Sequence, residues 1–173
     1  MRHETGGRLT EWLFERLREG AVVKARGPQG HFTLRSAPGT PLIFIAGGTG
    51  FAPVKAMIEQ QLAIGPTADI RLFWGAGGRE DLYELDILGA WTQRGSDIQC
   101  TVAVDRGPLP EAMPAGVQAV SGSVAQAIVA SAVKLTGYDG YVAGSPAMMS
   151  SVVDALATAG VERDRIRIDS FGL

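Results

Sequence analysis

The chain of 173 residues is 46% hydrophobic and 20% charged, which is enough apolar material for an ordinary globular domain without a metal or disulfide staple. Its 16 basic and 18 acidic residues leave a formal net charge of -2, which gives no electrostatic basis for binding nucleic acid or an anionic membrane. One cysteine and two histidines exclude an internal disulfide, a four-cysteine zinc site and an ordinary iron–sulfur cluster.

The start of the sequence is polar and lacks the apolar stretch of a secretion signal. No uninterrupted apolar run approaches the roughly 20 residues that a membrane-spanning helix needs. We therefore expect a cytoplasmic protein that binds neither nucleic acid nor a membrane.

The first residues resemble the end of a domain. A short helix is expected between a cap at Thr10 and a stop at Gly20, with three residues on its buried side: Leu13, Phe14 and Leu17. Residues 21–25 and 31–34 have the composition of two short strands around a turn at 27–30. Residues 36–41 are typical of a linker.

From Leu42 onward, short apolar runs alternate with longer amphipathic segments. Such runs are typical of strands buried on both faces of a parallel sheet, and they are residues 42–46, 70–74, 98–104, 140–143 and 166–168. The alternation of strands and helices predicts a doubly wound α/β domain with a parallel sheet of about five strands.

Apolar residues at helical spacing place the helices between these strands. Two helices have one apolar face each, formed by Val54, Met57, Ile58 and Leu62, and by Met149, Val152, Val153 and Leu156. A third helix is predicted from a cap at Ser121 or Ser123 through Ala132. The helical pattern of residues 81–94 is weaker, because Gly89 interrupts it.

The segment after the first strand is rich in glycine. Gly47, Gly48 and Gly50 lie between the strand and the next helix, where free backbone N–H groups and the helix dipole suit a pyrophosphate. A Cβ atom here would hold a phosphate away from the backbone, Thr49 can add a hydroxyl donor, and Pro53 fits the first turn of the helix.

Two departures disfavour an ordinary dehydrogenase domain. Pro53 stands where the third glycine of the usual dinucleotide fingerprint would be, and the second strand does not end in the acidic residue that usually holds the ribose.

Residues 48–53 resemble the pyrophosphate loop of the ferredoxin–NADP reductase family, which includes reductase components of bacterial oxygenases and NAD(P)H–flavin reductases. Three further stretches follow in that family's order. Residues 72–75 with 79–83 resemble its second strand and adenosine-side loop, residues 141–148 its segment beside the nicotinamide, and residues 167–171 its last strand and terminal aromatic.

The resemblance also extends upstream. Residues 7–10 resemble the turn that holds the flavin pyrophosphate, and residues 27–32 resemble the turn that closes the flavin barrel. The resemblance implies a C-terminal remnant of an FAD-binding β-barrel over residues 1–38 and an NAD(P)-binding domain over residues 39–173. The rest of the barrel is expected upstream of Met1.

The resemblance implies binding of NAD(P)H and FAD, with hydride passing between the two cofactors and no catalytic side chain or metal site. The residues implied for NAD(P)H are Gly47, Gly48, Thr49, Gly50, Pro53, Gly75, Arg79, Gly144, Ser145, Pro146, Met148 and Phe171. Those implied for FAD are Gly7 and Thr10. Ala143 replaces the cysteine that often lies near the transferred hydride, and Ser145 replaces the first proline of that segment.

Several of these residues also have a plainer interpretation. Phe171 can be a core aromatic instead of a ring-stacking residue, Met148 can fill core space, and Trp74 is interpreted as packing. Arg79 can meet a ribose phosphate and favour NADPH, but Glu80 and Asp81 beside it repel one, so NADH is slightly favoured.

Three functional hypotheses follow. The chain is the nucleotide half of a flavin reductase that passes electrons to a partner protein or to free flavin, a nucleotide-binding module without reductase activity, or a decayed copy with neither. The turn at residues 7–10 favours the first. Without the barrel, an apolar face with Phe171 and part of the helix at residues 12–17 is expected to support a homodimer.

Overall fold

The computed structural model describes residues 6–27, 29–64, 69–94 and 97–170. The chain divides into two compact units, Met1–His31 and Phe32–Leu173. This division lies before the expected one at residue 38, because Phe32 and Leu34 already pack against the core of the second unit. In addition, the Tyr141 hydroxyl accepts a hydrogen bond from the backbone N–H of Arg35 at 2.9 Å.

Among its described residues, the first unit contains one helical segment, formed by α1 (Arg8–Glu11) and a π-helical turn, η1 (Trp12–Arg16). Gly7 is its N-cap, so the predicted cap at Thr10 is wrong; the Thr10 hydroxyl instead donates to the Gly7 carbonyl at 3.1 Å. The segment ends before Leu17 and not at Gly20, and Phe14 is exposed rather than buried.

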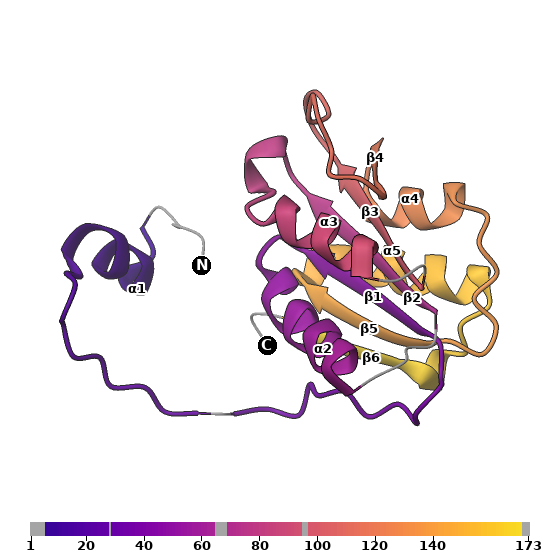
Figure 1. Ribbon diagram of the computed structural model, residues 1–173, viewed down its shortest axis with the longest axis horizontal. Helices are drawn as coiled ribbons and strands as arrows, with labels where there is room; N and C mark the ends of the chain where they lie inside the picture. Colours follow the sequence, from indigo (N-terminus) through magenta and orange to yellow (C-terminus); the bar gives the residue numbers. More distant parts are fainter. Residues whose placement is uncertain (1–5, 28, 65–68, 95–96, 171–173) are drawn as a thin grey trace. The chain divides into compact units, whose positions relative to one another are not determined.

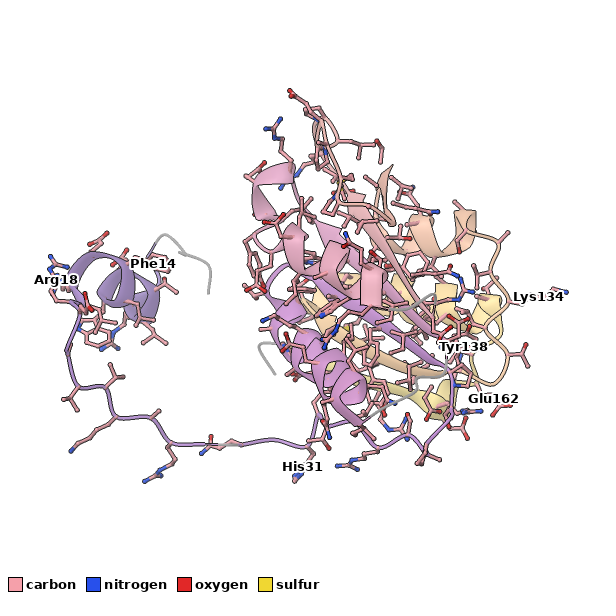
Figure 2. The ribbon with its side chains drawn as sticks, viewed as in Figure 1. Phe14, Arg18, His31, Lys134, Tyr138 and Glu162 are labelled. Atoms are coloured by element: carbon pink, nitrogen blue, oxygen red, sulfur yellow. The ribbon has the colours of Figure 1, made fainter. Side chains whose placement is uncertain are left out.

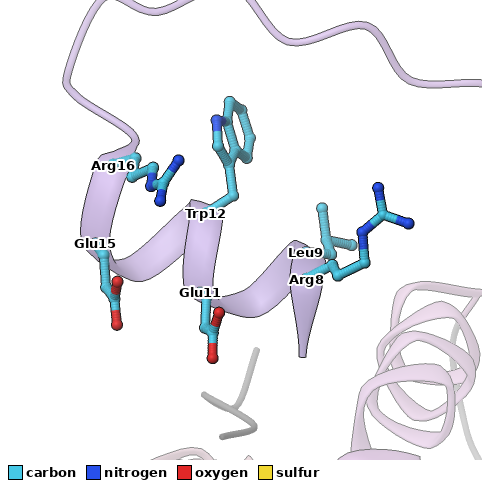
Figure 3. Close-up of a pocket in the computed structure, with 6 residues that line it drawn as sticks. All are labelled: Arg8, Leu9, Glu11, Trp12, Glu15 and Arg16. Atoms are coloured by element: carbon cyan, nitrogen blue, oxygen red, sulfur yellow. The ribbon is translucent and has the colours of Figure 1, made fainter. Parts of the chain in front are cut away.

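The acidic side chains of this helical segment lie on the side opposite to its basic and apolar ones. Figure 3 shows Arg8, Leu9, Trp12 and Arg16 on one side, and Glu11 and Glu15 on the other.

The two strands predicted for residues 21–25 and 31–34 do not form in the described part of the chain. The composition of those residues favours a strand, but a strand also needs a neighbouring strand to supply its hydrogen bonds.

The second unit is a doubly wound α/β domain, as predicted. In the described part of the chain, its parallel sheet has six strands in the order β4-β3-β2-β1-β5-β6. The strands are β1 (Leu42–Gly47), β2 (Ile70–Ala76), β3 (Ile98–Val104), β4 (Val117–Ser121), β5 (Asp139–Gly144) and β6 (Ile166–Ser170). The strand β4 was missed, because this short edge strand is only partly buried and lacks a continuous apolar run.

Helices cover the sheet on its two faces. Those in the described ranges are α2 (Phe51–Ile64), α3 (Leu85–Arg94), α4 (Val124–Ala130) and α5 (Pro146–Ala159), with short 3-10 turns at η2 (Gly48–Gly50), η3 (Arg79–Asp81) and η4 (Arg163–Arg165). Buried residues of α2 and α3 share one core with the sheet, and those of α4 and α5 share another. Figure 1 shows α2 and α3 in front of the sheet.

The helices predicted for the second unit are confirmed, although α3 begins at Leu85 and not at residue 81. Ser123 caps α4, but this helix ends at Ala130, and Ala132 adopts a left-handed conformation with a φ of 49°. Gly89 does not interrupt α3; it is buried there, and a Cβ atom on it would lie 2.5 Å from the Cβ of Pro114. In the described residues, no helix is both long enough and apolar enough to cross a membrane.

Candidate functional site

The site predicted from the glycine-rich loop lies at the point where the order of strands in the sheet reverses. The chain moves from β1 outward to β4 on one side, then returns to place β5 and β6 on the other side of β1. In open α/β sheets, ligands bind at such a switch point, outside the carboxyl ends of the strands. Here the switch point lies between β1 and β5, and Ala46 is the register partner of Ala143 across these two strands. We call residues 47–50 and 144–148, which comprise the last residue of each strand and the loop after it, the switch-point site.

The loop after β1 turns directly into a helix. Gly48 has a φ of 51°, a left-handed conformation that glycine adopts without strain, and it starts the 3-10 turn η2 that leads into α2. Thr49 is exposed, and Pro53 lies in the first turn of α2, as predicted. The first N–H groups of such a helical start have no partner within the helix, so they can bind an anion.

Contacts within the protein explain three glycines of these loops. Only at Gly50 is the nearest contacting group a fixed backbone atom; Gly47 and Gly144 face the flexible side chain of Met148. A Cβ atom on Gly50 would lie 2.1 Å from the carbonyl oxygen of Ala143, and one on Gly47 would lie 2.2 Å from the sulfur of Met148. A Cβ atom on Gly144, the last residue of β5, would lie 2.6 Å from the same sulfur. The prediction that a Cβ would keep a phosphate away applies most directly to Gly48, whose Cβ would meet no protein atom within 4 Å.

The loop after β5 forms the other side of the switch-point site. Ser145 is the exposed N-cap of α5, and its side chain makes no capping hydrogen bond to this helix. Pro146 is the first residue of α5, and the half-buried Met148 places its thioether against the glycines of both loops. The structure therefore brings Gly47, Gly144 and Met148 together from segments far apart in the sequence.

The loop after β2 carries charged residues that converge on its two glycines. Arg79 is exposed in η3, and the same turn brings the Asp81 carboxylate back to accept a hydrogen bond from the Gly78 N–H at 3.3 Å. A Cβ atom on Gly77 would lie 3.0 Å from both Asp81 Oδ2 and Arg106 Nη2. An acidic group thus lies beside the end of β2, although no acidic residue ends that strand in the sequence.

Sequence reasoning missed Arg106 and treated Asp81 only as a neighbour of Arg79. The signal for Asp81 was its position three residues after Gly78, the spacing at which an acidic side chain can accept a hydrogen bond from the N–H of the residue before a helical turn. Arg106 had no comparable signal. It comes close because the N–H groups of Asp105 and Arg106 bond to the carbonyls of Ala76 and Gly77, both at 3.0 Å.

Aromatic side chains pack against the loop after β1. Trp74 is fully buried, stacks on Phe51 with ring centroids 4.1 Å apart, and donates its indole N–H to the Gly48 carbonyl at 3.2 Å. Tyr83 packs edge-on against Trp74, with centroids 5.3 Å apart. The interpretation of Trp74 as a packing residue is confirmed. Gly75 also has a packing role, because a Cβ atom on it would lie 3.0 Å from Val124 of α4.

The remaining predicted residues lie elsewhere. Gly7 and Thr10 belong to the first unit, and Phe171 lies outside the described residues. Within the described ranges, no three His, Cys, Asp or Glu side chains gather as a metal-binding group. Cys100 is buried in β3, and burial raises the pKa of its thiol to about 12, so it is poorly suited to nucleophilic chemistry.

Comparisons with known proteins agree with this geometry. Residues 44–154 match the family described as the oxidoreductase NAD-binding domain. The chain is 30% identical over 171 residues to the ferredoxin–NAD(P)(+) reductase component of the naphthalene 1,2-dioxygenase system of Pseudomonas putida, covering 99% of this chain and 50% of that protein. It is 32% identical over 173 residues to the xylene/toluene monooxygenase electron transfer component XylA of Pseudomonas putida, covering 96% and 46%.

A solved structure has the same fold. The Amycolatopsis cytochrome P450 reductase GcoB superposes with a TM-score of 0.86 at 29% identity, covering 99% of this chain and 50% of that one. The chain therefore spans about half the length of these relatives.

Proposed function

The chain belongs to the oxidoreductase NAD-binding domains of the ferredoxin reductase type, and from this we propose that it binds NADH at the switch-point site between β1 and β5 and presents the nicotinamide to a flavin. The observation that carries the proposal is the meeting of the Gly47 and Gly144 loops at the switch point of the sheet. When bound, the reduced nicotinamide supplies a hydride and the flavin accepts it.

The residues of the switch-point site fit the parts of a dinucleotide. The start of η2 and α2 offers backbone N–H groups and a favourable dipole to the pyrophosphate, and the exposed Thr49 adds a hydroxyl. On the other side, the exposed Ser145 can orient the nicotinamide amide, and Met148 gives an apolar contact beside it. These side chains bind and orient; the chemistry needs no acid–base pair from the protein.

The loop after β2 supports a preference for NADH over NADPH. The Asp81 carboxylate can accept hydrogen bonds from ribose hydroxyls, and its charge opposes a 2′-phosphate at the same place. Glu80 adds a second negative charge, so the two acidic residues balance Arg79 of this loop and the nearby Arg106, which follows β3. Arg106 can instead pack its guanidinium against the adenine ring.

A flavin contribution from the first unit is part of the proposal. Gly7 and Thr10 lie at the start of its helical segment, but the Thr10 hydroxyl proton is used in the bond to the Gly7 carbonyl. The hydroxyl must therefore rotate before it can donate to a flavin phosphate. The electrons would pass on to a partner protein, or the hydride to free flavin.

The test is a calorimetric titration of the chain with NADH, NADPH and FAD in separate runs. A matched pair of variants sharpens it: Gly48→Ala and Gly39→Ala both place alanine at a positive φ where no atom lies within 4 Å. We expect Gly48→Ala to weaken NADH binding at least about tenfold and Gly39→Ala to leave it unchanged. Absence of nucleotide binding by the unaltered chain at millimolar concentration would refute the proposal.

The same titration separates the two functional candidates. Binding of NADH together with FAD supports the reductase half. Binding of NADH without FAD supports a nucleotide-binding module that needs a flavin from another molecule.

A further inference from the structure

The face of the sheet that packs on α4 and α5 contains an unusual polar region. Strands inside a parallel sheet are normally apolar on both faces. The interior strands β2 and β3 nevertheless carry Arg71, Gln99 and Thr101 on this face, and β4 adds Gln118. Arg71 is the register partner of Gln99, and Thr101 is the partner of Gln118.

These residues line a pocket of about 190 Å³, together with Phe73, Ser131 and Val133. The pocket exists because α4 is short and ends at Ala130, so it covers only part of the strands. Its rim is the turn at residues 131–133, where Ala132 holds a φ of 49°. This conformation is costly for a residue with a Cβ atom.

Two polar side chains of the pocket, those of Arg71 and Gln99, are held in place by a hydrogen-bond network. Arg71 donates to Tyr138 Oη at 3.1 Å, to Gln99 Oε1 at 2.8 Å and to Asp69 Oδ2 at 3.1 Å. Tyr138, labelled in Figure 2, also donates to Asp69. Because the Gln99 carbonyl is used by Arg71, its amide N–H groups are the part left to face a ligand.

We propose that this pocket binds a small, neutral, polyhydroxylated molecule of the size of one sugar ring. The carboxamides of Gln99 and Gln118 and the hydroxyl of Thr101 offer donors and acceptors that match neighbouring hydroxyl groups. The ion pair with Asp69 compensates the charge of Arg71, so the lining favours a neutral ligand over an anion. Phe73 and Val133 supply an apolar contact for the C–H groups of a ring.

This pocket is separate from the switch-point site. Its strand residues lie between the amino-terminal ends and the middle of β2, β3 and β4, whereas the switch-point site lies at the carboxyl ends of β1 and β5. A ligand here therefore does not compete with the nucleotide, and the two sites can be tested independently.

The experiment is a two-dimensional NMR titration of the full chain with myo-inositol, using cyclohexanol as a ring of the same size with a single hydroxyl. We expect millimolar binding of myo-inositol, shifts in the side-chain amide signals of Gln99 and Gln118, and no such shifts with cyclohexanol. Saturation with NADH should leave the affinity for myo-inositol unchanged.

Two variants test the assignment of the pocket. Thr101→Val keeps the shape of a β-branched side chain, and Gln118→Ala alters an exposed position on the edge strand; each should weaken binding about fivefold. Gln93→Ala, an exposed glutamine of α3, is the matched control and should have no effect. Absence of binding, equal response to cyclohexanol, competition by NADH, or unchanged affinity in both variants would overturn the proposal.

Discussion

The backbones of Gly50 and Ala143 lie against each other. They are so close that a Cβ atom on Gly50 would lie 2.1 Å from the Ala143 carbonyl oxygen. The contact joins the turn after β1 to β5 and leaves no flexible side chain that could move aside. The two loops of the switch-point site are therefore held at a fixed spacing by a residue without a side chain.

Gly50→Ala should destabilise the domain by roughly 3 kcal/mol, because the new methyl group forces the two backbones apart. Urea unfolding followed by circular dichroism measures this change. Gly27→Ala is the control, since a Cβ at that position meets no atom within 4 Å and its φ is ordinary. Equal stability of the two variants would contradict the close contact.

Asp81→Asn should reduce the proposed preference for NADH over NADPH. Removing the negative charge beside Gly77 should strengthen NADPH binding about fivefold, because a 2′-phosphate no longer faces a carboxylate. Calorimetric titration with both nucleotides gives the ratio of the two dissociation constants. Asp86→Asn, at an exposed position of α3, should leave this ratio unchanged. An unchanged ratio in Asp81→Asn would show that Asp81 does not distinguish the two nucleotides.

Trp74→Phe should retain the stacking on Phe51 but lose the indole hydrogen bond to the Gly48 carbonyl. We expect a loss of about 1 kcal/mol in unfolding free energy and weaker NADH binding, because the loop loses an anchor. Trp12→Phe, in the first unit, is the control. If Trp74→Phe binds NADH as the unaltered chain does, the hydrogen bond does not position the loop.

Asp139 should make the domain sensitive to acid. Burial by itself raises the pKa of this carboxyl, but hydrogen bonds from Ser36 and Arg165 and the charges of Arg165 and Arg167 outweigh burial and lower the pKa below its usual value. A lowered pKa in the folded state stabilises the fold above the unfolded-state pKa of about 4, and this contribution is lost as the pH falls through the folded-state value.

The corresponding variant is Asp139→Asn, which should lower the Tm at pH 7 by removing an ion pair whose Nε–Oδ1 distance is 2.7 Å. The difference from the unaltered chain should shrink as the pH falls below about 4. Asp154→Asn, whose ion pair with Arg163 is largely exposed, should have a much smaller effect. A constant difference at all pH values would refute the role of ionised Asp139.

Cys100 should be unreactive in the folded protein. Burial raises the pKa of its thiol to about 12, so almost no thiolate is present at pH 8. A thiol-reactive dye should label it only after unfolding in denaturant. Rapid labelling of the native chain would show that β3 is more accessible than its burial indicates.

The sequence predicted the parts of the fold that depend on continuous apolar runs. The bounds of β3 agree with the predicted residues 98–104, and the apolar face of α2 is buried at Val54, Met57 and Ile58. The strand β4 was missed because it lies at the edge of the sheet, where most of its residues are partly buried or exposed and form no continuous apolar run. Gly89 misled the prediction of α3, since its role is the close approach of Pro114 from a distant segment.

The site was predictable where local geometry determines it. The conformation of Gly48 and the position of Pro53 follow from a strand that turns at once into a helix. The contacts of Gly47, Gly50 and Gly144 were not predictable, because they depend on the adjacency of β1 and β5. Arg106 was missed for the same reason, since its position follows from the pairing of β2 with β3.

The adjacency of β1 and β5 also bears on how the domain folds. Leu42 pairs with Asp139, so the strand that carries the glycine loop gains one of its two neighbours only after most of the unit has been synthesised. Closing such a long stretch of chain costs entropy before any contact compensates it, which slows folding. The half-sheet of β1 to β4 is thus expected to form first, and the switch-point site to form in the last step, when β5 docks against the open edge of β1.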